Sequence, residues 1–114
     1  MENVVVIGCG SYIDTVASCP GDWKCFKAAR LGEGFFSDQT NILALVRCTC
    51  PGRAILSNVK MTMKFLDTTV DRIHIATCMA FAYPDCAHIN MEKLAKNMAE
   101  EYDVPVTMGS HKYF

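Results

Sequence analysis

The sequence predicts an α/β fold: a three-layer sandwich with a mostly parallel sheet of about four strands, flavodoxin-like or Rossmann-like. Short apolar runs recur without polar alternation, which is typical of strands covered on both faces. Segments with helical spacing separate these runs, and this alternation calls for parallel strands joined by right-handed crossovers. With 114 residues, the chain (1–114) is long enough for one domain and too short for two.

Four strands are predicted in chain order. Three of them, Asn3–Cys9, Asn41–Arg47 and Arg72–Cys78, are mostly apolar and lack clean polar alternation. The fourth, Val104–Met108, contains Pro105, which has no backbone N–H to donate to a neighbouring strand. We therefore expect the fourth strand at an edge of the sheet.

Three helices are predicted between the strands. The first lies near Trp23–Leu31 and ends at Gly32. The second (53–67) and the third (91–102) each carry one apolar stripe, and Asn90 is the expected N-cap of the third. The stripes consist of Ile55, Val59, Met63 and Leu66, and of Met91, Leu94, Met98 and Tyr102.

The composition narrows the functional classes. A formal net charge of −1 with scattered lysine and arginine argues against a nucleic-acid partner. No apolar run approaches the roughly 20 residues of a membrane span, so no membrane partner is expected. The start of the chain lacks the pattern of a secretory signal, and we expect a cytoplasmic protein. In that reducing compartment, its seven cysteines point to metal binding or catalysis rather than to disulfides.

Cysteine or histidine follows the end of each predicted strand. The positions are Cys9, then Cys19 and Cys25, after the first strand; Cys48 and Cys50 after the second; Cys78, Cys86 and His88 at and after the third; and His111 after the fourth. In an open parallel sheet, all these positions lie at the carboxyl edge, where such folds place their sites. The sequence therefore predicts a Cys/His cluster at that edge.

Zinc is the first candidate for such a cluster, because it is held by cysteine and histidine in tetrahedral sites. The candidate ligands are Cys9, Cys50, Cys78, Cys86, His88 and His111, with Cys19, Cys25 and Cys48 less favoured. These are more ligands than one zinc ion needs, which suggests two ions or thiols that exchange on one ion. Cys86 and His88 stand two residues apart in a predicted turn, a spacing that can present both to one ion.

Two further readings remain open. The same thiolates suit a redox protein, either with an iron–sulfur cluster on Cys9, Cys50, Cys78 and Cys86 or with thiol–disulfide exchange at Cys19 or Cys50. Alternatively, the chain is an interaction module whose cysteines are simply buried. The sequence specifies neither an enzymatic reaction nor a protein partner, and it leaves a homo-oligomer open.

Individual histidines also have simpler explanations. His74 lies in the middle of a predicted strand, where we expect a buried ring with satisfied nitrogens rather than a ligand. His111 lies in the terminal segment and, taken alone, would be a solvated histidine.

Several motifs have the order and spacing of a known family. They are Cys9 at the end of the first strand, Cys19-Pro20-Gly21, Cys25-Phe26-Lys27-Ala28, Cys50-Pro51-Gly52, Ile73-His74-Ile75-Ala76-Thr77-Cys78, Cys86 with His88, and Gly109-Ser110-His111-Lys112-Tyr113. Over nearly the whole chain, this series resembles the CGGC domain family of small proteins rich in cysteine and histidine. The resemblance implies a metal-binding domain, with zinc as the first metal.

The chain departs from the family pattern at the motif that gives the family its name. In place of Cys-Gly-Gly-Cys it reads Arg47-Cys48-Thr49-Cys50, so the second cysteine matches Cys50, Arg47 replaces the first, and Cys48 is shifted by one residue. If the family site uses both cysteines, this chain has moved or lost a ligand.

Overall fold

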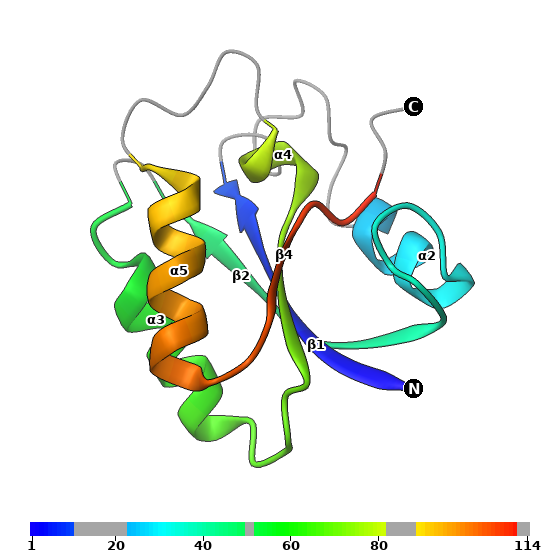
Figure 1. Cartoon of the computed structure of the whole chain (residues 1–114), viewed down its shortest axis with the longest axis horizontal. Coiled ribbons are helices and arrows are strands. Elements are labelled where there is room, and N and C mark those ends of the chain that lie inside the picture. Colours follow the sequence, from blue (N-terminus) through cyan, green and yellow to red (C-terminus); the bar gives the residue numbers. More distant parts are fainter. Residues whose placement is uncertain (11–22, 50–51, 82–88, 112–114) are drawn as a thin grey trace.

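The computed structural model describes residues 1–10, 23–49, 52–81 and 89–111 (Figure 1). Four predicted ligands, Cys19, Cys50, Cys86 and His88, lie outside these ranges. The elements in chain order are β1 (Glu2–Cys9), α2 (Trp23–Leu31), β2 (Thr40–Cys48), α3 (Ile55–Phe65), β3 (Arg72–Ile75), α4 (Thr77–Ala80), α5 (Met91–Tyr102) and β4 (Val106–Met108).

The four strands of the described residues form one parallel sheet in the order β2-β1-β3-β4. This order corresponds to the flavodoxin-like arrangement, in which the strand order reverses between β1 and β3. The predicted α/β class, with a mostly parallel sheet of about four strands, is confirmed.

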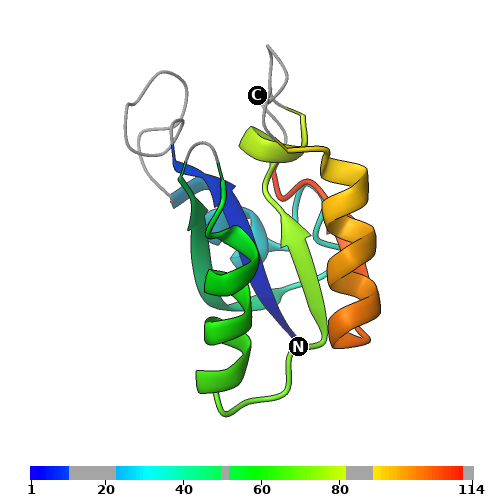
Figure 2. The ribbon, with the colours of Figure 1, turned by 90° about the vertical axis from the view of Figure 1, so that its left-hand side faces the viewer.

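Helices lie on both faces of the sheet (Figures 1 and 2). On one face, Ile55 and Val59 of α3 and Leu94 and Met98 of α5 pack with the sheet in one core cluster. On the other face, α2 contributes Cys25, Ala28 and Ala29 to a second cluster. The sheet is therefore the middle of three layers.

The central strand β1 explains why the apolar runs lack polar alternation. Val5 and Ile7 belong to the α3 and α5 core, whereas Val4 and Val6 belong to the α2 core. All four are fully buried, because each face of this strand is covered by helices.

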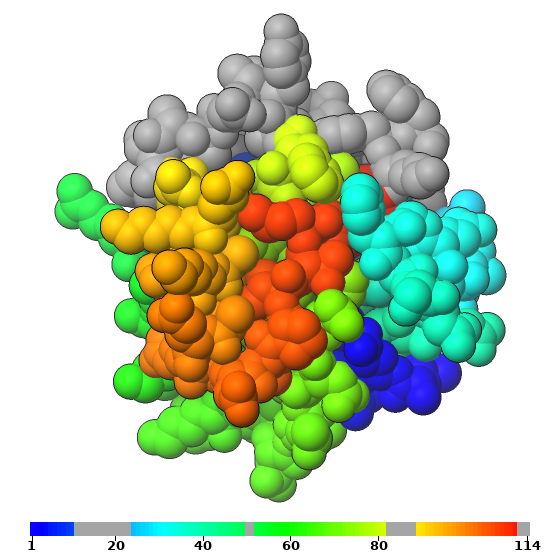
Figure 3. Space-filling model, in the orientation of Figure 1, coloured from blue at the N-terminus to red at the C-terminus, as the bar shows by residue number. Residues whose placement is uncertain are grey.

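The strand β4 lies at an edge of the sheet, as Pro105 predicted. Pro105 only accepts: its carbonyl receives the Ile73 N–H at 3.0 Å. In the space-filling view, the segment around β4 is visible at the surface between α5 and the α2 side of the molecule (Figure 3).

The third predicted strand, Arg72–Cys78, was drawn too long. The strand β3 ends at Ile75, and Thr77 and Cys78 begin the short helix α4. The Ala76 N–H still bonds to the Ile7 carbonyl at 2.7 Å, but the Ala76 carbonyl accepts from helical N–H groups at positions 79 and 80. Apolar residues continue from Ile73 and Ile75 to Ala76, past the end of the strand, so hydrophobicity alone did not mark this change.

His74 on β3 is buried, at 1% exposure, as predicted. Its Nδ1 lies 2.9 Å from the Gly109 carbonyl oxygen. Because a carbonyl only accepts, Nδ1 carries the hydrogen in the neutral ring. Burial lowers the pKa of His74 below its ordinary value of 6.5; the Gly109 bond and Glu2 act upward, and Arg72 acts downward.

We expect Asn90→Ala to lower the free energy of unfolding by about 1 kcal/mol. The Asn90 side chain caps α5 by accepting the Lys93 N–H at 3.0 Å, and alanine leaves that donor without this partner. Chemical denaturation measures the loss. Asn90→Asp is the matched control because it keeps the accepting oxygen, and equal stability of the Ala and Asp variants would contradict the capping role.

We also expect the free energy of unfolding of the wild type to decrease as the pH is lowered below about 6.5. The folded-state pKa of His74 lies below its unfolded value, so the unfolded chain binds more protons between the two values. The slope from this one group is at most about 1.4 kcal/mol per pH unit.

The comparison variant for this pH dependence is His74→Asn, whose amide can donate to the Gly109 carbonyl but does not titrate. We expect this variant to be less stable than the wild type at every pH. The quantity to compare is therefore how steeply the free energy of unfolding of each protein changes between pH 7 and pH 5. Parallel slopes would show that His74 does not contribute.

Candidate functional site

Cys9 and Cys48 stand side by side at the carboxyl edge of the sheet. They are register partners at the ends of the parallel strands β1 and β2. Both contact the core formed with α3 and α5, and Cys48 is buried whereas Cys9 is half-buried. Register partners of neighbouring strands share a face, so the two thiols form a pair.

Cys78 approaches this pair from the other side of β1. The Cys9 backbone N–H donates to the Cys78 Sγ at 3.4 Å. The expectation that Cys9 and Cys78 meet if their strands are neighbours is therefore confirmed. A donated N–H stabilises negative charge on sulfur and so favours the thiolate, which is the form that binds metals.

Cys9 at the end of β1 and Cys78 just after β3 lie where the strand order reverses, whereas Cys48 ends the edge strand β2. The chain leaves β1 toward α2 on one face, and leaves β3 toward α5 on the opposite face. Connections that diverge in this way open a crevice at the carboxyl ends of the two strands, the usual ligand position in open α/β sheets. Cys9 and Cys78 flank that position.

Gly52 approaches the Cys48 sulfur closely. A Cβ on Gly52 would lie 3.2 Å from the Cys48 Sγ and 2.4 Å from the Ile89 Cδ1. Gly52 also has a φ of +87°, a left-handed conformation that favours glycine. Gly52 therefore lies directly against a buried thiol.

His111 also lies at this edge, and it is half-buried rather than a fully solvated residue of the terminal segment. Its backbone N–H donates to the Thr77 Oγ1 at 3.1 Å, and its carbonyl accepts from the same hydroxyl. Because Thr77 directly precedes Cys78, this contact ties the segment of His111 to the short helix that carries Cys78.

Cys25 lies in the core cluster on the α2 face of the sheet, which also contains Cys78. It lies on α2, is buried in the cluster on that face, and contacts Ser110, with 3.1 Å between Sγ and Oγ. A buried cysteine in such a contact is well explained by packing.

Among the described residues, no three Cys, His, Asp or Glu side chains are arranged to hold one metal ion. The thiols of Cys9, Cys48 and Cys78 gather at one edge without enclosing a common centre. Cys50, Cys86 and His88, the other predicted donors, lie outside the described ranges.

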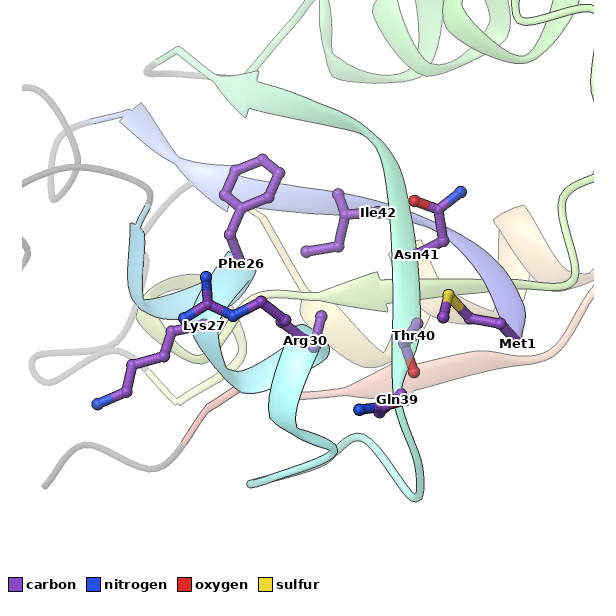
Figure 4. A pocket seen from close by; sticks show the side chains of 9 residues that line it. Met1, Phe26, Lys27, Arg30, Gln39, Thr40, Asn41 and Ile42 are labelled. Atoms are coloured by element: carbon purple, nitrogen blue, oxygen red, sulfur yellow. The ribbon is translucent and has the colours of Figure 1, made fainter.

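Two hollows flank different parts of the sheet. One, of about 540 Å³, lies next to the carboxyl edge and is lined by three methionines, Met79, Met91 and Met108, with Phe81 and Ile89. The other, of about 590 Å³, lies at the amino end of β2, where Phe26 and Arg30 of α2 face Ile42 (Figure 4). The second hollow is far along β2 from the cysteines at its carboxyl end.

Phe36 is buried, with its ring centroid 4.4 Å from that of His74, whereas Phe26 and Phe35 are about 40% exposed.

No helix in the described ranges has both the length and the apolar character needed to cross a bilayer.

Sequence patterns indicate no individual role for Thr77 or Ser110. Both are buried polar residues with side-chain hydrogen bonds at the carboxyl edge. The sequence does place the polar Thr77 directly after Ala76. A threonine at that position is equally typical of a simple helix start, so it does not predict a buried hydrogen-bond network.

Comparison with known proteins identifies a family for the chain. The CGGC domain matches residues 3–111 of the chain. An uncharacterized protein of Methanocaldococcus jannaschii is 33% identical over 117 residues, which cover 96% of this chain and 86% of that relative. No solved structure matches the chain. Because the match spans nearly the whole sequence, the chain belongs to the CGGC domain family.

Proposed function

We propose that the protein binds a metal ion, zinc in the first place, through cysteines at the carboxyl edge of its sheet. The observation that carries this proposal is that cysteines from three different elements lie at this edge of the sheet. Cys9 is the register partner of Cys48, and its N–H contacts the Cys78 sulfur at 3.4 Å.

The chemistry of these donors fits zinc. Thiolate sulfur and imidazole nitrogen are its usual protein ligands. The N–H donated to Cys78 resembles the outer contacts that orient metal ligands and tune their basicity. Cys48 and Cys78 are buried at the end of the sheet, which limits the access of water that would compete for the metal.

The proposed ligand set draws on both the structure and the sequence. Cys9, Cys78 and His111 come from the described residues, and Cys48 joins them because of its place beside Cys9. The sequence adds Cys50, Cys86 and His88 as the donors that would complete the site. Four of these suffice for one tetrahedral ion, and the surplus is compatible with two ions or with exchange of ligands.

Bound zinc would supply either a structural cross-link between the loops or, with an open coordination position, a Lewis acid. The protein would provide the thiolates and a partly dry edge. Thiols that bind a metal persist in a reducing compartment, so this proposal implies a cytoplasmic location.

Replacing Cys78 or Cys48 with serine is expected to weaken zinc binding by at least about tenfold, because even changes in the outer shell of a metal site cost that much. The measurement is elemental mass spectrometry on protein purified without oxygen or chelator, followed by competition with a chromophoric chelator. Cys25→Ser is the matched control: it removes a buried thiol on α2 but keeps a partner for Ser110.

The same samples decide between zinc and the redox alternative. Zinc near one or two equivalents in a colourless protein supports the proposal, and iron with visible absorption favours an iron–sulfur cluster instead. A wild type that stays free of metal after reconstitution, or equal metal loss in Cys25→Ser and Cys78→Ser, would overturn the zinc site.

Removal of the metal is expected to lower the melting temperature, and zinc to restore it. A ligand that binds only the folded state stabilises it by about 2.7 kcal/mol at a free concentration one hundred times its Kd. Thermal unfolding with chelator, with added zinc and with added magnesium measures the effect. Magnesium should not restore stability because it prefers oxygen ligands.

A further inference from the structure

The strand β2 forms one edge of the sheet. It pairs with β1 on one side, and its other side faces none of the other described strands. Figure 2 shows β2 at the border of the sheet, next to α3. The middle of the strand, residues 42–45, is apolar and only partly buried. An edge of this kind is a template on which another extended chain can pair.

A hollow lies against this edge on each face of the sheet. On the α2 face, the hollow of about 590 Å³ lies between Phe26 of α2 and Ile42 of β2 (Figure 4). On the α3 face, a third hollow of about 520 Å³ lies between residues 44–47 of β2 and Met61 of α3. Successive side chains of a strand point to opposite faces, so a strand added to β2 would direct side chains into both hollows.

Both hollows have apolar walls that are open to solvent. Phe26 is 41% exposed and Met61 is 56% exposed, although each lies on a helix that packs on the sheet. On α3, Met61 is followed one turn later by Phe65, which is also exposed. A partner that covers these side chains would remove apolar surface from water, which favours binding.

The charged side chains of the three elements around this edge have the same sign. The elements β2, α2 and α3 contain no aspartate or glutamate, and their charged residues are Lys24, Lys27, Arg30, Arg47, Lys60 and Lys64. The whole chain has a formal net charge of −1, so positive charge is concentrated here. Both Lys27 and Arg30 line the hollow at Phe26. The carboxylate that precedes β2, that of Asp38, accepts the Gln39 N–H at 2.7 Å within its own turn.

A second copy of the chain fits this edge poorly. Two β2 strands related by a two-fold axis would bring the cations of both copies together, and like charges repel. The register with β1 also skips Leu43, which lies between the partners of Val4 and Val5. Such an irregularity bends a strand and limits continuous pairing with another long strand. A short segment of opposite charge meets neither obstacle.

We propose that the outer edge of β2 is a docking site for a short, extended, acidic segment of another protein, which joins the sheet as an added strand. Apolar side chains of that segment occupy the hollows at Phe26 and Met61. Its carboxylates lie beside Lys27 and Arg30. In this binding mode the main-chain hydrogen bonds supply affinity, and the hollows supply specificity. The site needs no metal, so it stands or falls independently of the proposed function.

The probe for this site is a fluorescein-labelled octapeptide in which glutamate alternates with leucine and valine. Its counterpart has lysine in place of glutamate. We expect the acidic peptide to bind, and the lysine peptide to bind at least about tenfold more weakly, because like charges oppose association. NMR titration of the labelled protein should show shifts at β2, Phe26 and Met61. No shifts with acidic peptide at about 1 mM, or equal affinity for both peptides, would overturn the proposal.

Strand addition makes a separate prediction about the peptide backbone. Alternate N–H groups of a strand point to the same edge, so N-methylation of one alternate set removes its bonds to β2, whereas methylation of the other set spares them. We expect one methylated acidic peptide to bind at least about tenfold more weakly and the other to stay near the parent peptide. Equal affinities of the two methylated peptides would overturn the added strand.

The charge contribution is tested with Lys27→Gln combined with Arg30→Gln. We expect this double variant to bind the acidic peptide about fivefold more weakly or worse, the effect of losing one or two exposed ion pairs. Lys93→Gln with Lys96→Gln is the matched control, because it removes two exposed cations from α5 and leaves β2 unchanged. All four side chains are exposed, so both variants should fold. Equal losses in the two variants would show an unspecific charge effect and overturn the site.

The same samples test two other partners. An oligothymidine of eight nucleotides that binds more tightly than the acidic peptide, and competes with it, would overturn the proposal in favour of single-stranded nucleic acid. A dimer in sedimentation experiments that the acidic peptide dissociates would overturn it in favour of a second copy. We expect weaker binding of the oligothymidine and no effect of the peptide on self-association.

Discussion

The parallel pairing of β1 with β2 and β3 is the constraint on which the rest of the structure depends. Parallel strands require a crossover after each strand, so every carboxyl end opens onto the same edge. Cysteines that follow different strands therefore lie at the same edge, although they are far apart in sequence. The position of β1 between β2 and β3 also puts Cys9 at the centre, with Cys48 on one side and Cys78 on the other.

The polar network around Thr77 provides what this short sheet lacks. The strand β4 has only three residues, and its pairing alone would hold the following segment weakly. The bonds from Thr77, His74 and Phe35 extend the order past β4 to His111. Their burial makes each unsatisfied group costly, so the segment has one well-defined position. The amino ends are joined by a separate contact, in which Arg72 pairs with Glu2 at 3.2 Å and donates to Thr107.

The fold could be predicted from the sequence because its cause is local. Fully apolar runs specify central parallel strands, and Asn90 and Pro105 specify a helix start and an edge. The end of β3 could not be predicted, because the same apolar residues continue through Ala76 into α4. The approach of Cys9 to Cys78 followed from strand order, which hydrophobic patterns do not determine. The role of Thr77 depends on contacts with residues more than thirty positions away, and no spacing rule reports such contacts.

The shift of one residue in the family motif has a structural meaning. Side chains alternate between the two faces of a strand, so position 47 and position 48 of β2 face opposite sides. Arg47 is exposed, whereas Cys48 is buried and is the register partner of Cys9. Cys48 therefore cannot take the place of a cysteine at position 47 without a change of face. Its neighbours are instead Cys9 and Gly52, at the junction of β1 and β2.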